Sequence, residues 1–174
     1  EKSTATFYFG NILMDYQIWK RNPNLVSGQE YVTNQLVAKE ASTKGFGAII
    51  DEYVYINSEN VDSTFNIIPK SSGLIHGVGI DLGGGVGCIS STLARRDLVD
   101  KIYCVELVED AVKLCHNIVK QEILKNEKHK VVSVVGDYDN LELEDNSIDF
   151  AVSWDSIHHS TDPVKTFKEC KRVL

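Results

Sequence analysis

A glycine-rich segment in the middle of the chain constrains the fold most strongly. Residues 80–87 read IDLGGGVG, directly after an apolar run and directly before a segment with helical periodicity. Glycine adopts positive φ readily and lets the backbone approach a ligand closely. In open α/β sheets, ligands bind at the carboxyl ends of the strands, where such a loop would lie. The loop alone is a weak signal, because turns are rich in glycine for other reasons.

The segments around this loop alternate between strand-like and helix-like patterns. The predicted strands are residues 77–82, 101–107, 130–135 and 148–154, and the predicted helices are residues 86–97, residues 109–126 and a last helix that Pro163 opens. Proline is well suited to the first position of a helix. Apolar strands that alternate with helices indicate a parallel sheet covered on both faces. The predicted fold class is therefore α/β, with a Rossmann-like, doubly wound, mainly parallel sheet.

The first part of the chain differs in character from the rest. We expect residues 1–72 to be a helical N-terminal extension, either an acceptor lid or a core-covering region, and residues 73–174 to be the cofactor-binding core. Residues 29–43 predict an amphipathic helix that Gly45 and Gly47 end. Residues 49–56 fit a strand or a helix, and residues 69–73 predict a loop. The early aromatic residues either line a pocket or anchor elements on the core, and the core interpretation is the safer one. These aromatic residues are Phe7, Tyr8, Phe9, Tyr16 and Trp19.

Charge and cysteine usage narrow the class of protein. The 174 residues carry a formal net charge of −7, which argues against a broad basic surface for nucleic acid or an anionic membrane. No apolar run approaches the ~18 residues that span a bilayer, and no signal-peptide pattern opens the chain. The cysteines lie in apolar patterns without metal-ligand spacing, so we expect reduced structural cysteines, no metal and a cytoplasmic protein. They are Cys88, Cys104, Cys115 and Cys170.

Two details of the loop favour a nucleoside cofactor without a pyrophosphate. Asp81 stands two residues before Gly83, and a carboxylate there repels a pyrophosphate and attracts an amino group or a sulfonium. The dinucleotide fingerprint G-x-G-x-x-G needs a third glycine at position 88, which is cysteine here. A nicotinamide-dependent oxidoreductase is therefore the less favoured alternative.

Polar residues follow the next two predicted strands. Glu106 ends the second strand, where an acid accepts hydrogen bonds from both ribose hydroxyls; the alternative is a solvated charge. Asp137 and Tyr138 follow the third strand. They are suited to accept from an adenine amine and to pack on its ring, or they form a plain turn. We expect these strand ends to converge on one crevice.

The segment after the fourth predicted strand carries candidate proton acceptors. Residues 153–159 read SWDSIHH. His158 or His159 is suited to act as a general base near neutral pH, and Asp155 is a further candidate. The alternative is that one histidine packs locally while the other is solvated.

Taken together, these motifs resemble the class I S-adenosylmethionine-dependent methyltransferases. The resemblance covers residues 76–174, and the run SIDFAVSWDSIHHSTDPVKTFKECKRVL is similar to the small-molecule subgroup. It implies S-adenosylmethionine as cofactor and methyl transfer to an unidentified small-molecule acceptor, with a non-catalytic cofactor-binding or partner-dependent module as the alternative. The residues implied to bind the cofactor are Asp81, Gly83, Gly85 and Gly87 at the methionine part, Glu106 at the ribose with Leu107 beside it, Asp137 and Tyr138 at the adenine, and Trp154 near the methyl-donor side with Asp155.

The resemblance departs from the family at the C-terminus. In the family, the helix ending in R-V-L precedes three further strands, whereas this sequence ends at Leu174. We therefore expect a sheet that is incomplete at the C-terminus, in the order third, second, first, fourth, with the fourth strand at an edge. An apolar edge strand favours self-association or a partner segment that completes the sheet, unless residues 1–72 cover it. The activity of this chain alone is left open.

Overall fold

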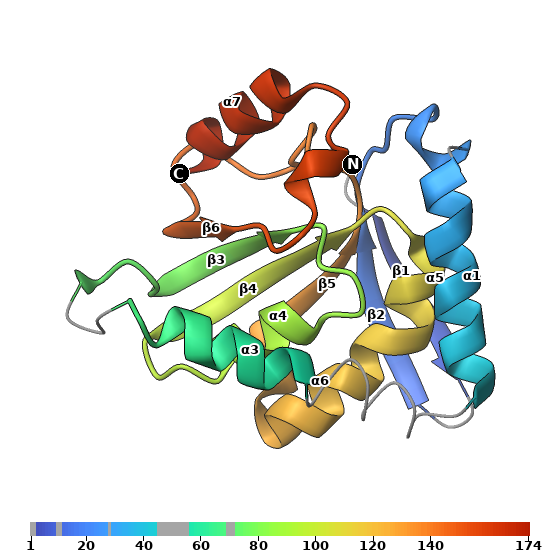
Figure 1. Cartoon of the computed structure of the whole chain (residues 1–174), viewed down its shortest axis with the longest axis horizontal. Helices are drawn as coiled ribbons and strands as arrows, with labels where there is room; N and C mark the ends of the chain where they lie inside the picture. The colour runs from blue at the N-terminus through green and yellow to red at the C-terminus, as the bar shows by residue number, and fades with distance from the viewer. Residues whose placement is uncertain (1–2, 10–11, 28, 45–55, 69–71) are drawn as a thin grey trace.

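A central sheet organises the molecule, and segments from both ends of the chain contribute strands to it (Figure 1). The computed structural model describes residues 3–9, 12–27, 29–44, 56–68 and 72–174. Within these residues the sheet has the order β1-β2-β5-β4-β3-β6. Its strands are β1 (Ser3–Phe9), β2 (Ile12–Ile18), β3 (Gly77–Leu82), β4 (Val99–Glu106), β5 (Val131–Val135) and β6 (Phe150–Val152).

Helices pack around this sheet. They are α1 (Gln29–Lys44), α3 (Ile56–Phe65), α4 (Cys88–Ala94), α5 (Glu109–Ala111), α6 (Asn117–Leu124) and α7 (Pro163–Val173). A π-helical turn, Val112–His116, joins α5 to α6, and 3₁₀ turns span Leu25–Ser27, Lys125–Lys130 and Ile157–His159. No helix in the described ranges is long and apolar enough to cross a membrane.

The parallel core confirms the predicted fold class. Strand β3 pairs in parallel with β4 and β6, and β4 pairs in parallel with β5, which gives the predicted order third, second, first, fourth. Because side chains alternate across a strand, β4 serves two cores. Cys104 packs with Leu93 of α4, whereas Val105 packs with Val173 of α7. All four cysteines are buried and free, as expected.

The helices that follow the glycine loop differ in detail from the prediction. Helix α4 begins at Cys88 because Gly87, with φ +90°, has a left-handed conformation and only caps the helix. The predicted helix 109–126 contains the π-helical turn and ends at Leu124. Helix α7 begins at Pro163 as predicted, and the Asp162 carboxylate accepts a hydrogen bond from the Lys165 backbone N–H at 3.1 Å.

The N-terminal region contributes strands as well as the predicted helix. β1 and β2 form an antiparallel hairpin, and β2 joins β5 in parallel through Gln17 and Ile18. The hairpin thus extends the sheet on the side of β5, away from β6, so these two strands do not cover the β6 edge. Helix α1 confirms a helix over residues 29–43, but not the predicted amphipathic pattern, because the apolar Val32 and Leu36 are exposed whereas Ala38 is buried. Gly45, Gly47 and residues 49–55 and 69–71 lie outside the described residues.

Two of the early aromatic side chains belong to the core. Tyr16 and Trp19 are buried, which confirms the core interpretation for both. Trp19 packs against Tyr103 of β4 with ring centroids 6.0 Å apart. The side chains of residues 7–9 lie outside the described part of the molecule.

Candidate functional site

A cavity opens at the carboxyl ends of β3, β4 and β5. Its volume is about 720 Å³, and its walls come from the loop after β3, the end of β4, the turn after β5, the segment after β6, and α1 with the turn before it. This is the place where open α/β sheets bind ligands. The predicted residues that line it are Gly83, Gly85, Glu106, Leu107, Asp137, Tyr138, Trp154, Asp155 and His159.

The loop after β3 requires glycine for several distinct reasons. Gly83 and Gly85 have φ of +77° and +54°, a region that other residues rarely adopt. A Cβ atom on Gly83 would lie 2.5 Å from Ser156 Cβ, and one on Gly84 would lie 2.3 Å from Cys104 Sγ. A Cβ atom on Gly85 would meet no atom within 4 Å. The loop therefore packs tightly on the sheet side and presents open backbone to the cavity at Gly85.

Glu106 lies at the end of β4 with both carboxylate oxygens engaged. The side chain is only 9% exposed, so it is not a solvated strand-end charge. One oxygen accepts from the Gly85 N–H and the other from the Val108 N–H, each at 2.8 Å. A carboxylate offers about four lone-pair sites, so Glu106 keeps acceptor capacity for a ligand beside its backbone hydrogen bonds. Burial raises the pKa of Glu106 to about 7, against the lowering effect of these backbone hydrogen bonds.

Asp81 is completely buried behind the glycine loop and is not among the described residues that line the cavity. Its Oδ2 accepts a hydrogen bond from Ser90 Oγ at 2.7 Å. Its Oδ1 is buried and has no hydrogen-bond partner in the described part of the chain. Burial raises the pKa of Asp81 to about 6. Gly87 also lies off the cavity wall, at the start of α4.

Asp137 and Tyr138 follow β5, as predicted, and both line the cavity. The Asp137 carboxylate accepts from the Asn22 N–H at 2.6 Å and from the Asp139 N–H at 3.0 Å. It therefore also ties the N-terminal segment to the end of β5. The Tyr138 hydroxyl donates to the Ser156 carbonyl at 3.2 Å, which links the ends of β5 and β6.

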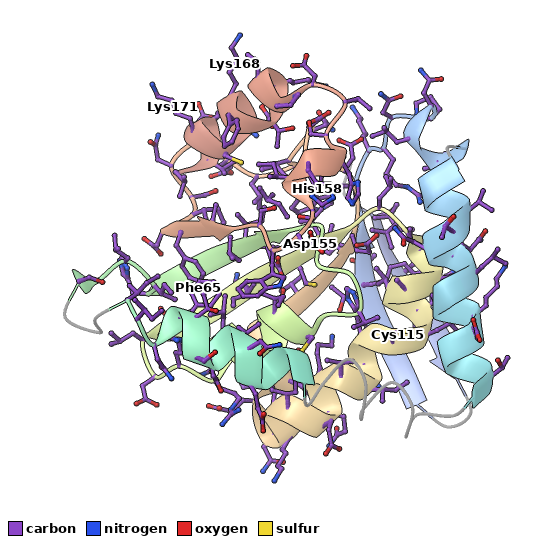
Figure 2. The ribbon with its side chains drawn as sticks, in the orientation of Figure 1. Phe65, Cys115, Asp155, His158, Lys168 and Lys171 are labelled. Carbon is purple, nitrogen blue, oxygen red and sulfur yellow. The ribbon has the colours of Figure 1, made fainter. Side chains whose placement is uncertain are left out.

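The segment after β6 separates the two histidines. Both histidines are exposed, but His159 lines the cavity and His158 is not among the described lining residues. The two rings are in contact but tilted, with centroids 3.7 Å apart and an angle of 49° between their planes. His158 Nδ1 lies 3.8 Å from Asp155 Oδ1, and Figure 2 shows both side chains in this segment. Asp155 has φ +51°, a left-handed conformation that aspartate tolerates better than most residues.

Several cavity residues were not predicted from the sequence. They include Asn24, Leu25, Tyr31, Asn34 and Ala38 from the N-terminal region, and Ser156, Ser160 and Thr161 after β6. Helix α1 packs against α5, which brings its residues to the cavity. No motif in the sequence predicts that α1 packs against α5, because contacts between distant elements depend on the tertiary fold.

Comparison with known proteins identifies the family. Residues 80–174 match the model of the methyltransferase domain. No curated protein matches the chain significantly. Among solved structures, a candidate S-adenosyl-L-methionine-dependent methyltransferase from Methanococcus maripaludis has 24% identity and a TM-score of 0.59, over 80% of this chain and 58% of its own. A candidate sarcosine dimethylglycine methyltransferase from Galdieria sulphuraria has 28% identity and a TM-score of 0.54, over 68% of this chain and 41% of its own.

The same fold also serves other chemistry. The [4+2]-cyclase SpnF has 19% identity and a TM-score of 0.59, over 81% of this chain and 56% of its own. The chain spans about half the length of these solved structures. The family match, however, covers more than half of the chain. The chain therefore belongs to the methyltransferase-domain family, within the class I S-adenosylmethionine-dependent methyltransferases.

Proposed function

We propose that the cavity above β3, β4 and β5 binds S-adenosylmethionine and that the chain transfers its methyl group to a small-molecule acceptor. The observation that carries this proposal is that residues from three separate strand ends line the same cavity. In a chain of the methyltransferase family, Gly85, Glu106 and Asp137 come from three different strand ends and line one cavity of about 720 Å³.

The side chains and backbone of the cavity suit this cofactor. The open face of Gly85 admits close approach of a ligand, and Glu106 keeps acceptor positions for two ribose hydroxyls. Asp137 and Tyr138 are proposed to flank the adenine. Gly83 and Gly85 are proposed to hold the methionine part, with Leu107 and Trp154 as further walls.

Asp81 is proposed to favour the cationic part of the cofactor from behind the loop. Its buried Oδ1 lacks a partner, and an unpaired buried acceptor is costly unless a donor satisfies it. A cation near this carboxylate would also offset the burial that raises its pKa. Gly87 contributes indirectly, since it turns the chain into α4.

The residues after β6 are proposed to orient the acceptor and to take its proton. When bound, S-adenosylmethionine supplies an electrophilic methyl group on a sulfonium sulfur. Holding an acceptor in line with that group accounts for much of the rate gain in reactions of this kind. A neutral imidazole nitrogen of His159, which lines the cavity, is the first candidate to remove a proton from the acceptor. His158 and Asp155 are the secondary candidates.

The charges around the cavity favour a small neutral or cationic acceptor. Its described lining includes four carboxylates and no lysine or arginine; the acids are Glu106, Asp137, Asp139 and Asp155. A wall of one charge sign disfavours ligands of the same sign, which argues against phosphorylated or nucleic-acid acceptors. The Galdieria protein, at 28% identity, is named for the small molecules sarcosine and dimethylglycine.

Residues 1–72 are proposed to shape the acceptor side of the cavity. Tyr31 and Asn34 of α1 line it, and Asn24 and Leu25 lie just before that helix. Acceptor specificity would then reside in this extension, while residues 73–174 hold the cofactor. The four buried, free cysteines support a reducing, cytoplasmic environment.

Turnover with a panel of acceptors tests the proposal. The purified chain is incubated with S-adenosylmethionine and small amines, phenols or carboxylic acids, and release of S-adenosylhomocysteine is measured. We expect release with a neutral or cationic acceptor, an amine or a phenol, and none with the carboxylic acids. Binding of S-adenosylhomocysteine without any acceptor-dependent release would instead support a non-catalytic or partner-dependent module.

A further inference from the structure

A buried histidine lies directly beneath the glycine loop. His116 is 1% exposed and ends the π-helical turn Val112–His116. Its Nε2 lies 2.9 Å from the Gly85 carbonyl oxygen, across 31 positions of sequence. A π-helical turn inside an α-helix shifts the side chains that follow it and is frequent at functional sites. Here the turn places the His116 imidazole against the glycine loop, which forms part of the cavity wall.

The contact fixes which ring nitrogen carries the proton. A carbonyl oxygen only accepts hydrogen bonds, so a distance of 2.9 Å requires a proton on His116 Nε2. His116 Nδ1 is buried without a hydrogen-bond partner in the described residues, so a second proton there would have no acceptor. Burial, and the positive charge of Lys120, lower the pKa of His116 to about 3. The ring is therefore a neutral donor over the whole working range of pH.

Gly85 is consequently held at both of its backbone polar groups. Its N–H donates to Glu106 Oε2 at 2.8 Å, and its carbonyl accepts from His116 Nε2. The His116 ring also packs under Gly87, since a Cβ atom there would lie 3.3 Å from His116 Cδ2. Gly85 itself faces open space. Two buried side chains thus hold the backbone of Gly85, the loop glycine that faces open space.

We propose that His116 is a positioning residue, which fixes the Gly85 carbonyl and so holds the Gly85 N–H on Glu106 and the loop in the shape that receives the cofactor. This inference rests on the proposed placement of the cofactor against Gly85 and Glu106. His116 acts only through Gly85, because it is not among the described residues that line the cavity. The three residues form one unit, in which the two side chains come from separate elements.

Three substitutions separate a hydrogen-bond donor from a space-filling ring. His116→Gln keeps an N–H donor at the reach of Nε2, His116→Asn brings its donor one bond short, and His116→Phe fills the space without a donor. Affinity for S-adenosylhomocysteine is measured by calorimetry, and exchange of the Gly85 amide proton is measured in the protein without ligand. Leu124→Val is the matched control, because Leu124 is buried in α6 and packs in the core with Leu93.

We expect His116→Phe and His116→Asn to bind S-adenosylhomocysteine about tenfold more weakly, with faster exchange at Gly85, and His116→Gln to stay within about threefold of the parent. Leu124→Val should lower the melting temperature without changing affinity. Equal affinity and equal exchange in His116→Phe and the parent would overturn the proposal. If the Phe variant does not fold, equal affinities of the Gln and Asn variants would overturn it. If the parent binds no S-adenosylhomocysteine, the cofactor proposal fails and the exchange rates alone decide the role of His116.

Discussion

The Gly85 N–H donates a hydrogen bond to Glu106 Oε2 at 2.8 Å, and this contact joins the loop after β3 to the end of β4. Each residue supplies the hydrogen-bond partner that the other lacks. A buried carboxylate requires donors, and an N–H in a left-handed turn requires an acceptor that the sheet does not provide. The contact fixes the Glu106 carboxylate and still leaves it acceptor capacity for a ligand.

Removal of the Glu106 carboxylate should weaken cofactor binding. If Glu106 accepts from two ribose hydroxyls, Glu106→Ala should lose about 2–4 kcal/mol of affinity for S-adenosylhomocysteine, the usual cost of losing charge-assisted hydrogen bonds. Calorimetry measures the loss. Glu144→Ala is the control, because Glu144 is exposed and lies outside the cavity lining. Unchanged affinity in Glu106→Ala would show that the ribose does not bind there.

Cofactor affinity should depend on pH through the same carboxylate. Burial raises the pKa of Glu106 to about 7, and the ionised form accepts stronger hydrogen bonds than the protonated form, one oxygen of which becomes a donor. Affinity for S-adenosylhomocysteine should therefore fall as the pH drops below about 7 and level off above it. In Glu106→Gln the part of the pH dependence that is due to Glu106 should disappear. A weaker dependence due to Asp81, whose pKa is raised to about 6, should remain. A flat profile in the parent from pH 5.5 to 8, fitted by calorimetry, would contradict this account.

The stability of the protein without ligand should change with pH in the opposite direction. A carboxyl whose pKa is raised on folding binds its proton more tightly in the folded state, so rising pH destabilises the fold. The free energy of unfolding should lose the contributions of Asp81 and Glu106 as the pH rises from about 4 to 7. S-adenosylhomocysteine should reduce this loss. Urea titrations at several pH values, with Glu106→Gln as control, measure it.

The core of the site could be predicted from sequence because its signals are local. Gly83 and Gly85 mark a turn that other residues do not tolerate, and Glu106 and Asp137 stand where parallel strands end. The short apolar run before the glycine loop predicted β3 at residues 77–82, where the structure has it. These features depend on a few neighbouring positions, so a single sequence reveals them.

The rest depends on contacts between distant segments. The hairpin of β1 and β2 pairs with β5, more than 110 positions away in sequence. The residue pattern of the hairpin does not predict which strand it pairs with. Tyr31 reaches the cavity only because α1 packs on α5. The sequence predicts an ordinary helix at His116, whereas a π-helical turn places this side chain under Gly85. Asp81 was expected at the ligand, but the loop covers it.

Replacement of the two histidines should have unequal effects on turnover. His159 lines the cavity and His158 does not. If His159 is the general base, His159→Ala should lower single-turnover rates by about two to four orders of magnitude, with cofactor affinity unchanged. His158→Ala is the matched control and should have the smaller effect. Equal and small losses in both variants would indicate that transfer needs only alignment of the two reactants.

The β6 edge should promote self-association of this polypeptide. In the described sheet, β6 pairs only with β3, and the N-terminal hairpin lies at the opposite edge. An unpaired edge strand is a template for pairing with another chain. Light scattering should therefore show association that rises with concentration, and Ala151→Lys, which places a charge on the exposed Ala151, should reduce it. A monodisperse parent at high concentration would contradict this expectation.

The most direct test of the central claim is a paired calorimetric titration of the unmodified chain with S-adenosylhomocysteine and with NAD. The glycine loop backed by Asp81, together with the acceptor capacity of Glu106, should favour a nucleoside whose tail carries an ammonium group over a pyrophosphate. We expect saturable, one-to-one binding of S-adenosylhomocysteine and no measurable heat with NAD. Tighter binding of NAD than of S-adenosylhomocysteine would contradict the account.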